Sequence, residues 1–221
     1  MEASKSQQLN MTIKIRLIRF FIFSMTILLT SCNEQTQKYN PKQDSKDPVT
    51  VIKENEQKAF EKNNDNLGQL VSTILFQVKT DNKKDFENGL IPWVDIENAK
   101  EDIPNLLHKD EVVIKDNSVK IIIDYPLTNQ YEFTLTSIKG FTRQQLLLEI
   151  SLNYYKLYDE EEKTATVKTI PIDKRTKMYN RNQTDGKYGI WGHDIADLVL
   201  EEIEVYKTAN GEIILTLNIG S

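Results

Sequence analysis

Cysteine, histidine and the motifs of familiar cofactor sites are scarce or missing in this chain of 221 residues. It has one cysteine, Cys32, and two histidines, His108 and His193. A single cysteine excludes an intrachain disulfide and a cysteine-ligated metal cluster. The sequence also lacks a Gly-x-Ser-x-Gly elbow, a Walker loop, a dinucleotide-binding glycine turn, an HExxH helix and an EF-hand loop. We therefore predict no metal and no cofactor, and no motif indicates an enzyme.

Basic residues are outnumbered by acidic ones. The whole chain has 28 Lys and Arg against 33 Asp and Glu, a net charge of −5. Residues 1–31 hold four basic residues and one acidic residue, so the remaining 190 residues have 24 basic against 32 acidic residues, a net charge of −8. An acidic protein without a DNA- or RNA-binding motif is a poor nucleic-acid binder. We predict no nucleic-acid partner and, from the length, one domain.

The N-terminus has the layout of a secretory signal. Lys14, Arg16 and Arg19 precede a mostly apolar run, 20–29, which ends in small residues. As a helix, residues 17–30 would reach roughly 21 Å, whereas the core of a bilayer needs about 30 Å. We predict that residues 1–31 are a signal peptide, with Met11 as a second candidate for the translation start.

The apolar run ends in Leu29-Thr30-Ser31-Cys32, which resembles the lipobox of bacterial lipoproteins. The resemblance covers residues 11–32 and concerns location alone. It implies that the Cys32 thiol is acylated and that the chain is cut just before it. Several acyl chains, each contributing about 0.8 kcal/mol per buried CH₂, would anchor the protein stably. Asn33, in place of the Asp that favours inner-membrane retention, indicates the outer membrane. The alternatives are an ordinary secreted protein and a short N-terminal membrane anchor.

A polar segment separates the lipobox from the first amphipathic pattern. Residues 33–46 contain one aromatic residue and no apolar cluster, a composition typical of a disordered linker. We predict a lipidated tether over 32–46 and a single domain over 47–221.

Helical spacing of apolar residues dominates the first part of this domain. Asp47 and Pro48 suit the N-cap and first position of a helix, and the spacing predicts a long amphipathic helix over 48–79. Gly68 and the run 63–66 weaken its middle, so two pieces are an alternative. A second, short helix is expected over 96–107.

From residue 111 the pattern predicts strands. Residues 112–114 and 119–123 flank a turn and read as a hairpin, and 131–136 alternates as a third strand. Residues 203–206 and 213–217 flank Asn210-Gly211, the strongest short hairpin signal. We expect a meander of antiparallel strands.

The best-specified helix covers 142–158. Thr142 and Gln145 have capping-box spacing, and Phe141 and Leu146 sit where a hydrophobic staple needs them. This helix should cover the open face of the sheet. We predict an α+β fold, with N-terminal helices and an antiparallel sheet of about five strands covered by one long capped helix.

A long basic segment, 163–190, stands out in the acidic domain. It has seven basic residues against Asp173 and Asp185, and a short strand is predicted over 166–172. One interpretation is a surface that binds an anionic group; the other, slightly favoured, is neutralisation of the acidic run 159–162. The candidate binding surface comprises Lys174, Arg175, Lys177, Arg181, Lys187, Trp191, His193 and Asp194.

The pair His193-Asp194 resembles the HD pair of metal-dependent phosphohydrolases, but the further His and Asp ligands are missing. A plainer interpretation makes Asp194 the N-cap and Asp197 the third residue of a short helical turn. His193 and Trp191 would then pack the loop against the core.

The residues favour a non-enzymatic lipoprotein of the bacterial cell envelope that binds another protein, as an inhibitor, an immunity-type protein or an accessory subunit. The alternative is a lipid or small-molecule carrier with a pocket between helix 142–158 and the sheet. The third interpretation is a hydrolase that uses His193 and Asp194.

Overall fold

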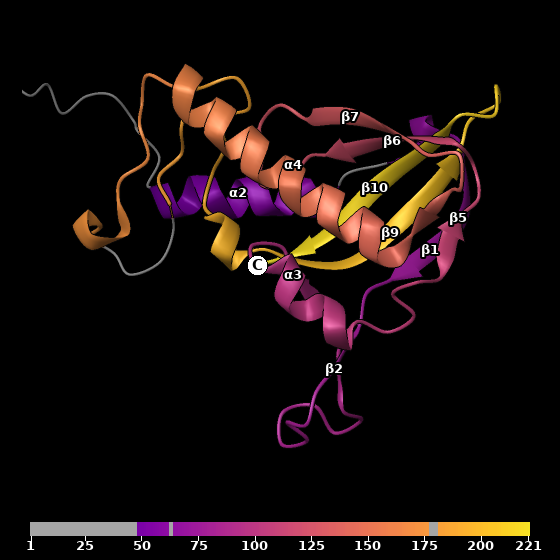
Figure 1. Ribbon diagram of the computed structural model, residues 1–221. Helices are drawn as coiled ribbons and strands as arrows, with labels where there is room; N and C mark the ends of the chain where they lie inside the picture. The colour runs from indigo at the N-terminus through magenta and orange to yellow at the C-terminus, as the bar shows by residue number, and fades with distance from the viewer. Residues whose placement is uncertain (1–47, 62–63, 177–180) are drawn as a thin grey trace, which may run out of the picture. The chain divides into compact units, whose positions relative to one another are not determined.

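A long helix packs on one face of a twisted, mostly antiparallel sheet (Figure 1). The computed structural model describes residues 48–61, 64–176 and 181–221, which belong to one compact unit. The predicted signal peptide, Cys32, the tether 32–46 and Lys177 lie outside the described residues. None of the helices in the described ranges is long and apolar enough to cross a membrane.

The described residues form three α-helices and ten strands, so the chain is a mixed α+β protein. The helices are α2 (Pro48–Phe60), α3 (Ala99–Asp102) and α4 (Arg143–Thr164). The strands are β1 (Gln69–Leu75), β2 (Val78–Lys79), β3 (Leu90–Ile91), β4 (Val94–Asp95), β5 (Val112–Ile114), β6 (Ser118–Ile123), β7 (Tyr131–Thr136), β8 (Phe141–Thr142), β9 (Val199–Lys207) and β10 (Ile213–Gly220).

The main sheet has six strands in the order β1-β9-β10-β6-β7, and β4 pairs with the start of β9. The predicted hairpin around Asn210-Gly211 is confirmed, since β9 and β10 form a long antiparallel pair. This hairpin lies in the middle of the sheet. The predicted antiparallel sheet is confirmed in part: most pairs are antiparallel, but β10 runs parallel to β6.

The capped helix is confirmed and extends to Thr164. The Thr142 hydroxyl accepts from the Gln145 amide, and the Gln145 side chain accepts from the Thr142 amide at 2.9 Å, which completes the capping box. One stripe of the helix is fully buried against the sheet, including Leu147, Ile150 and Tyr154. We call the sheet face that packs against α4 the inner face and the opposite one the outer face.

The predicted helix over 48–79 is wrong in its second half, which forms strand β1. The chain turns at Gly68, whose φ of 111° is open to glycine, and a Cβ there would lie 2.4 Å from the Lys207 carbonyl oxygen. This close approach brings 69–75 alongside β9, whose backbone pairs with it. The apolar spacing fits a helix, but β-branched residues such as Val71 and Thr73 favour a helix only weakly. Pairing with β9 therefore decides in favour of a strand.

Two other strand predictions are wrong. Strands β5 and β6 do not form a hairpin; β5 pairs with β8 at the start of α4, and β6 pairs with β7. Residues 166–172 form no strand, and 172–174 are a single 3₁₀ turn. Backbone amides of this stretch donate to side chains of the neighbouring loop. The Asp185 carboxylate accepts from the amides of Thr166 and Val167, and the Asn182 side-chain oxygen accepts from the amide of Ile170.

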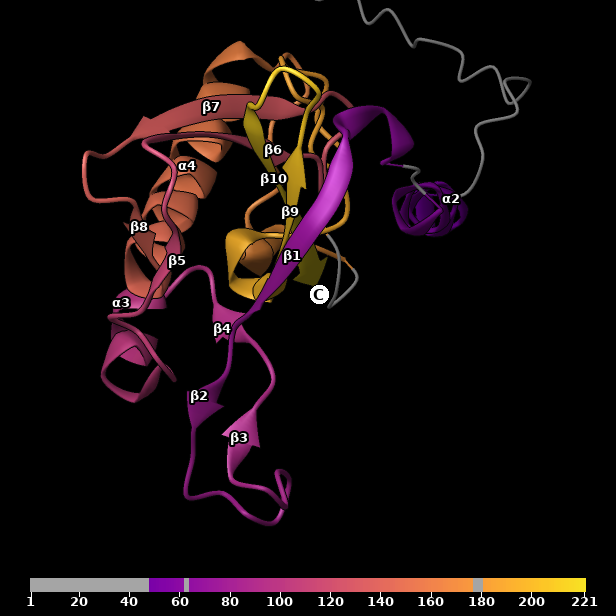
Figure 2. The ribbon, with the colours of Figure 1, turned by 90° about the vertical axis from the view of Figure 1, so that its right-hand side faces the viewer.

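Helix α2 lies on the outer side of the sheet, away from α4 (Figure 2). Among the side chains described in α2, Ile52 is buried, and it lies against Gly192. A cleft lies between α2 and the outer face.

Candidate functional site

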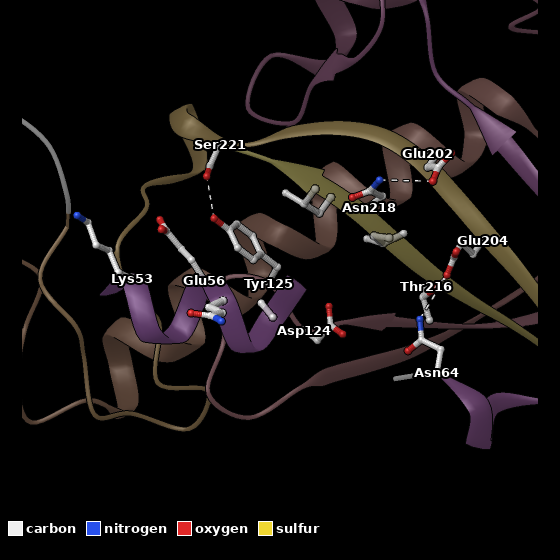
Figure 3. Close-up of a pocket in the computed structure, with 14 residues that line it drawn as sticks. Lys53, Glu56, Asn64, Asp124, Tyr125, Glu202, Glu204, Thr216, Asn218 and Ser221 are labelled. Atoms are coloured by element: carbon white, nitrogen blue, oxygen red, sulfur yellow. Dashed lines mark hydrogen bonds between the residues drawn. The ribbon is translucent and has the colours of Figure 1, made fainter. Parts of the chain in front are cut away.

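A cleft of about 810 Å³ separates α2 from the outer face of the sheet. Figure 3 shows Lys53 and Glu56 on the helix side and Glu202, Glu204 and Asn218 on the strand side. The strand residues reach the cleft because successive side chains of a strand point to opposite faces. In β9 the inward residue Ile203 is fully buried, so its neighbours on either side face outward.

Acidic side chains outnumber basic ones on the walls of this space, which we call the carboxylate cleft. Glu56, Asp124, Glu202 and Glu204 line it, and Lys53 is the one basic side chain among its described lining residues. A concave surface of one charge sign focuses the field and attracts groups of the opposite sign. The cleft is suited to a cationic ligand or to a basic segment of another protein.

Hydrogen bonds fix the carboxylate of Glu204. Its Oε2 accepts from the Tyr206 hydroxyl at 2.8 Å, from the Asn64 amide at 3.3 Å and from the Thr216 hydroxyl at 3.3 Å. The Asn218 amide donates to Glu202 at 3.4 Å, a weaker contact. The acidic wall thus presents oriented oxygens, which lose little side-chain freedom when a ligand binds.

Tyr125 lines the cleft and packs against two other rings. Tyr125 stacks on His193 with ring centroids 5.6 Å apart and meets the buried Trp191 edge-on at 5.1 Å. The Tyr125 and Ser221 hydroxyls lie 2.7 Å apart. Burial raises the pKa of Tyr125, and the carboxylates of Glu56 and Asp197 raise it further, against the lowering effect of the Ser221 bond. The phenol therefore remains neutral and able to hydrogen-bond.

His193 joins this end of the sheet to α2. Its Nε2 lies 3.4 Å from Glu56 Oε1 and 3.5 Å from the Ser221 hydroxyl. Both neighbours approach the same ring nitrogen, whereas a catalytic triad places the nucleophile and the acid on different nitrogens. The Tyr158 hydroxyl donates to the His193 carbonyl at 2.9 Å and fixes its backbone. The geometry is that of a contact between elements.

The Asp194 carboxylate contacts the basic segment. It caps the short turn Ile195–Asp197, as predicted, and accepts two bonds from Arg175 at 2.6 and 3.0 Å. Arg181 Nε lies 3.7 Å from the same carboxylate. The Asp194 oxygens are therefore occupied, and a shared acid–base site with His193 is absent from the described structure.

Arg181 is almost completely buried. Its guanidinium lies over the Tyr158 ring, 5.0 Å from the centroid, and it donates to the Thr169 hydroxyl. Burial lowers the pKa of Arg181, while the nearby Tyr158 and Asp194 oppose that shift. Its Nη1 has no hydrogen-bond partner among the described residues. Because this atom is also inaccessible to solvent, a ligand could reach it only after the loop moved.

A second set of contacts ties the basic segment to the acidic end of α4. Lys187 binds Glu160 at 2.8 Å, which raises the pKa of Lys187 and lowers that of Glu160. Glu161, fully buried, accepts from the Thr184 hydroxyl at 2.6 Å and from the amides of Gly186, Tyr188 and Gly189 at 2.7–3.1 Å. The loop is wrapped around this carboxylate.

The structure brings together part of the surface predicted from the sequence. Arg175 and Arg181 converge on Asp194, whereas Lys187 lies at the end of α4 and Lys174 is exposed. Trp191 is buried under the loop, as the packing interpretation predicts. Arg175, Arg181 and Lys187 thus each lie beside a carboxylate of this chain.

Sequence reasoning missed the carboxylate cleft. Its residues come from α2, from the last two strands and from positions just outside the elements: Asn64, Asp124, Tyr125 and Ser221. One signal was available: in the stretch 199–207, Glu202, Glu204 and Tyr206 alternate with apolar residues, which marks an outward face. The side of α2 that faces these residues could not be inferred from the sequence.

No group of acidic, histidine or cysteine side chains in the described ranges has a geometry that would hold a metal ion. No protein-family model, no curated protein and no solved structure matches this chain.

Proposed function

We propose that this protein is a lipid-anchored lipoprotein of the bacterial cell envelope, held in the outer membrane through Cys32, whose domain is a non-enzymatic protein-binding module. An inhibitor, an immunity-type protein and an accessory subunit are the roles that fit. The carboxylate cleft carries the binding part of the proposal, and the Leu29–Cys32 motif carries the anchor.

The cleft favours a partner that inserts a basic segment. A lysine or arginine side chain entering between α2 and β9 would meet the fixed oxygens of Glu204 and the nearby carboxylate of Glu202. Charge-assisted hydrogen bonds of this kind are among the strongest in proteins. The net charge of −8 outside the signal peptide would also speed the encounter with a basic partner.

The binding part is tested with synthetic peptides by calorimetric titration of the purified protein. We expect a peptide of alternating arginine and serine to bind and a glutamate–serine peptide of equal length not to bind. The double variant Glu202→Gln/Glu204→Gln should weaken binding about tenfold, which corresponds to 1.4 kcal/mol.

The matched control is the double variant Glu87→Gln/Glu101→Gln, which removes the same charge from two exposed glutamates outside the cleft. This variant should bind the arginine peptide nearly as well as the parent protein. Equal weakening in both double variants would show that net charge alone attracts the peptide, and the cleft would lose its role.

The anchor is tested separately by mass spectrometry and by fractionation of membranes. The parent protein should start at an acylated Cys32 and sediment with outer membranes. A Cys32→Ser variant should carry no acyl chain and leave the membrane fraction. An unmodified Cys32 in a protein that retains residues 1–31 would refute the anchor and leave the binding proposal standing.

The alternative, a lipid or small-molecule carrier with a pocket under α4, has little room in the described structure. The side chains of Leu147, Ile150 and Tyr154 fill the space between α4 and the inner face and are fully buried. The third interpretation, a hydrolase, needs His193 and Asp194 to act together, and their side chains contact different groups.

A further inference from the structure

Strand β1 is an open edge of the main sheet. It pairs with β9 on one side, and Figure 2 shows it as the outermost strand there. Six of its seven residues are exposed. Arg143 donates to the Leu75 carbonyl at the end of the strand. The backbone groups of 70–74 that face away from β9 have no partner within the described ranges.

This edge lacks the features that normally prevent strands from pairing with other chains. Charged residues, proline and short length are the usual protection. The sequence of β1, Gln-Leu-Val-Ser-Thr-Ile-Leu, has no charge and no proline. Leu70, Val71 and Leu75 are each about half exposed. Two protective features are present. A bulge at Val71 interrupts the register with β9, and the Arg143 guanidinium contacts the Leu75 carbonyl at the end of the strand.

The opposite edge strand, β7, provides the contrast. Its exposed residues are Glu132, Thr134 and Thr136, all polar, and Glu132 pairs with Lys120 at 2.5 Å. The apolar residues of β7 face the core. The same sheet therefore has one polar edge and one edge that is apolar and without charge.

We infer that β1 pairs with β1 of a second copy of this chain, antiparallel and centred on Thr73, to form one continuous sheet across a two-fold axis. Directly opposed residues in an antiparallel pair lie on the same face. Centring on Thr73 places Ser72 opposite Ile74 and Val71 opposite Leu75. Two of the three exposed apolar residues of one copy, Val71 and Leu75, therefore meet those of the other.

The absence of charge on β1 favours an uncharged partner strand, and β1 of a second copy is such a strand. A basic or an acidic segment would find no opposite charge on this edge. The nearest carboxylates on the outer face, Glu202 and Glu204, lie one strand further in, about 5 Å from the edge. They oppose the approach of two acidic copies only through a screened, longer-range repulsion. This inference does not depend on the proposed function.

Disulfide trapping tests the predicted register. The full-length chain is prepared in detergent with Cys32→Ser, which removes its one native thiol. In this background, Thr73→Cys places two thiols opposite each other across the axis, with Cβ atoms about 4.5–5.5 Å apart. The matched control is Thr134→Cys on the exposed face of β7. Mild oxidation should give a disulfide-linked dimer for Thr73→Cys in several-fold higher yield than for Thr134→Cys. Equal yields would overturn the inference.

Sedimentation of the same chain without an engineered thiol tests the seam itself. We expect a concentration-dependent dimer that becomes tighter as salt screens the acidic copies. The variant Val71→Lys/Leu75→Lys brings like charges together at the seam and should sediment as a monomer. The control Thr134→Lys/Thr136→Lys should still dimerise. A parent protein that is monomeric at all concentrations, or a dimer that the β1 variant leaves intact, would refute the pairing. Association that weakens with added salt would point to an acid–base contact instead, and would also refute it.

Discussion

The two faces of the main sheet carry opposite kinds of surface on the same strands. In β9, Ile203 packs under α4 and is fully buried, while Glu202 and Glu204 on either side of it line the carboxylate cleft. Apolar burial at the inner face contributes most of the stability that a sheet of this kind has. Partly exposed carboxylates at the outer face contribute little. The contrast teaches that the inner face maintains the fold and the outer face is free to serve recognition.

The largest expected effect comes from breaking the inner face. Ile203→Ala removes buried methyl groups from a packed core and should lower the free energy of unfolding by about 2–5 kcal/mol. Urea denaturation measures it. A loss below about 1 kcal/mol would mean that the space under α4 readjusts freely, contrary to its close packing.

The second largest loss of stability is expected at Glu161, because its carboxylate is fully buried. Glu161→Gln replaces one accepting oxygen by a donor facing the amides of the loop, and should cost about 2–3 kcal/mol. The matched control, Glu160→Gln, removes a neighbouring exposed ion pair with Lys187 and should cost less than about 1 kcal/mol. Comparable losses would show that the loop is not held by the buried carboxylate.

The pH dependence of the same residue sharpens this test. Burial raises the pKa of Glu161, but hydrogen bonds from Thr184 and the amides of Tyr188, Gly186 and Gly189 outweigh burial and lower it below the ordinary 4.5. A carboxylate with a lowered pKa contributes its full stability above the ordinary pKa and loses it as the pH falls through the folded-state pKa. The difference in unfolding free energy between the parent and Glu161→Gln should therefore be constant near neutral pH and shrink below about pH 4.5. A difference independent of pH down to 3 would contradict this assignment.

A smaller loss of stability is expected at His193, which connects α2 to the end of the sheet. His193→Ala removes the stack on Tyr125 and the contacts with Glu56 and Ser221, and should cost about 1 kcal/mol. Hydrogen exchange should quicken in α2 and remain slow in α4. Loss of all protection, including α4, would show that His193 is part of the core and not of the attachment of α2.

The smallest effect is expected at the outer face. Glu202→Gln should change the free energy of unfolding by less than about 0.5 kcal/mol. This change is far smaller than the loss expected for Ile203→Ala at the adjacent position. The consequence of Glu202→Gln should appear in binding of the arginine peptide instead. A large loss of stability at Glu202 would remove the distinction between the two faces.

Local patterns in the sequence predicted the elements whose contacts are close in the chain. The capping box of Thr142 and Gln145, the turn at Asn210-Gly211 and the cap at Asp194 each depend on residues within a few positions. The sequence also favoured neutralisation of the acidic run 159–162 by the basic segment that follows it in the chain. Lys187 of that segment contacts Glu160. The loop around Glu161 could not be foreseen, since its donors lie more than twenty residues away.

Strand β1 shows why the remaining predictions failed. Its apolar spacing fits a helix nearly as well as a strand, and the choice was made by β9, which lies more than a hundred residues later. The parallel pairing of β10 with β6 and the placement of α2 over Glu202 and Glu204 have the same origin. Long-range hydrogen bonding and burial decide them, and neither leaves a periodic signal at one position in the chain.

The sequence by itself determined the acidic balance, the α+β class and the caps and tight turns, because composition and short-range geometry suffice for these. Tertiary structure alone decided the strand order, the open β1 edge and the cleft of carboxylates between α2 and β9. The physical reason is that a surface exists only once distant segments are packed, and the same alternating strand can serve a core on one side and a ligand on the other.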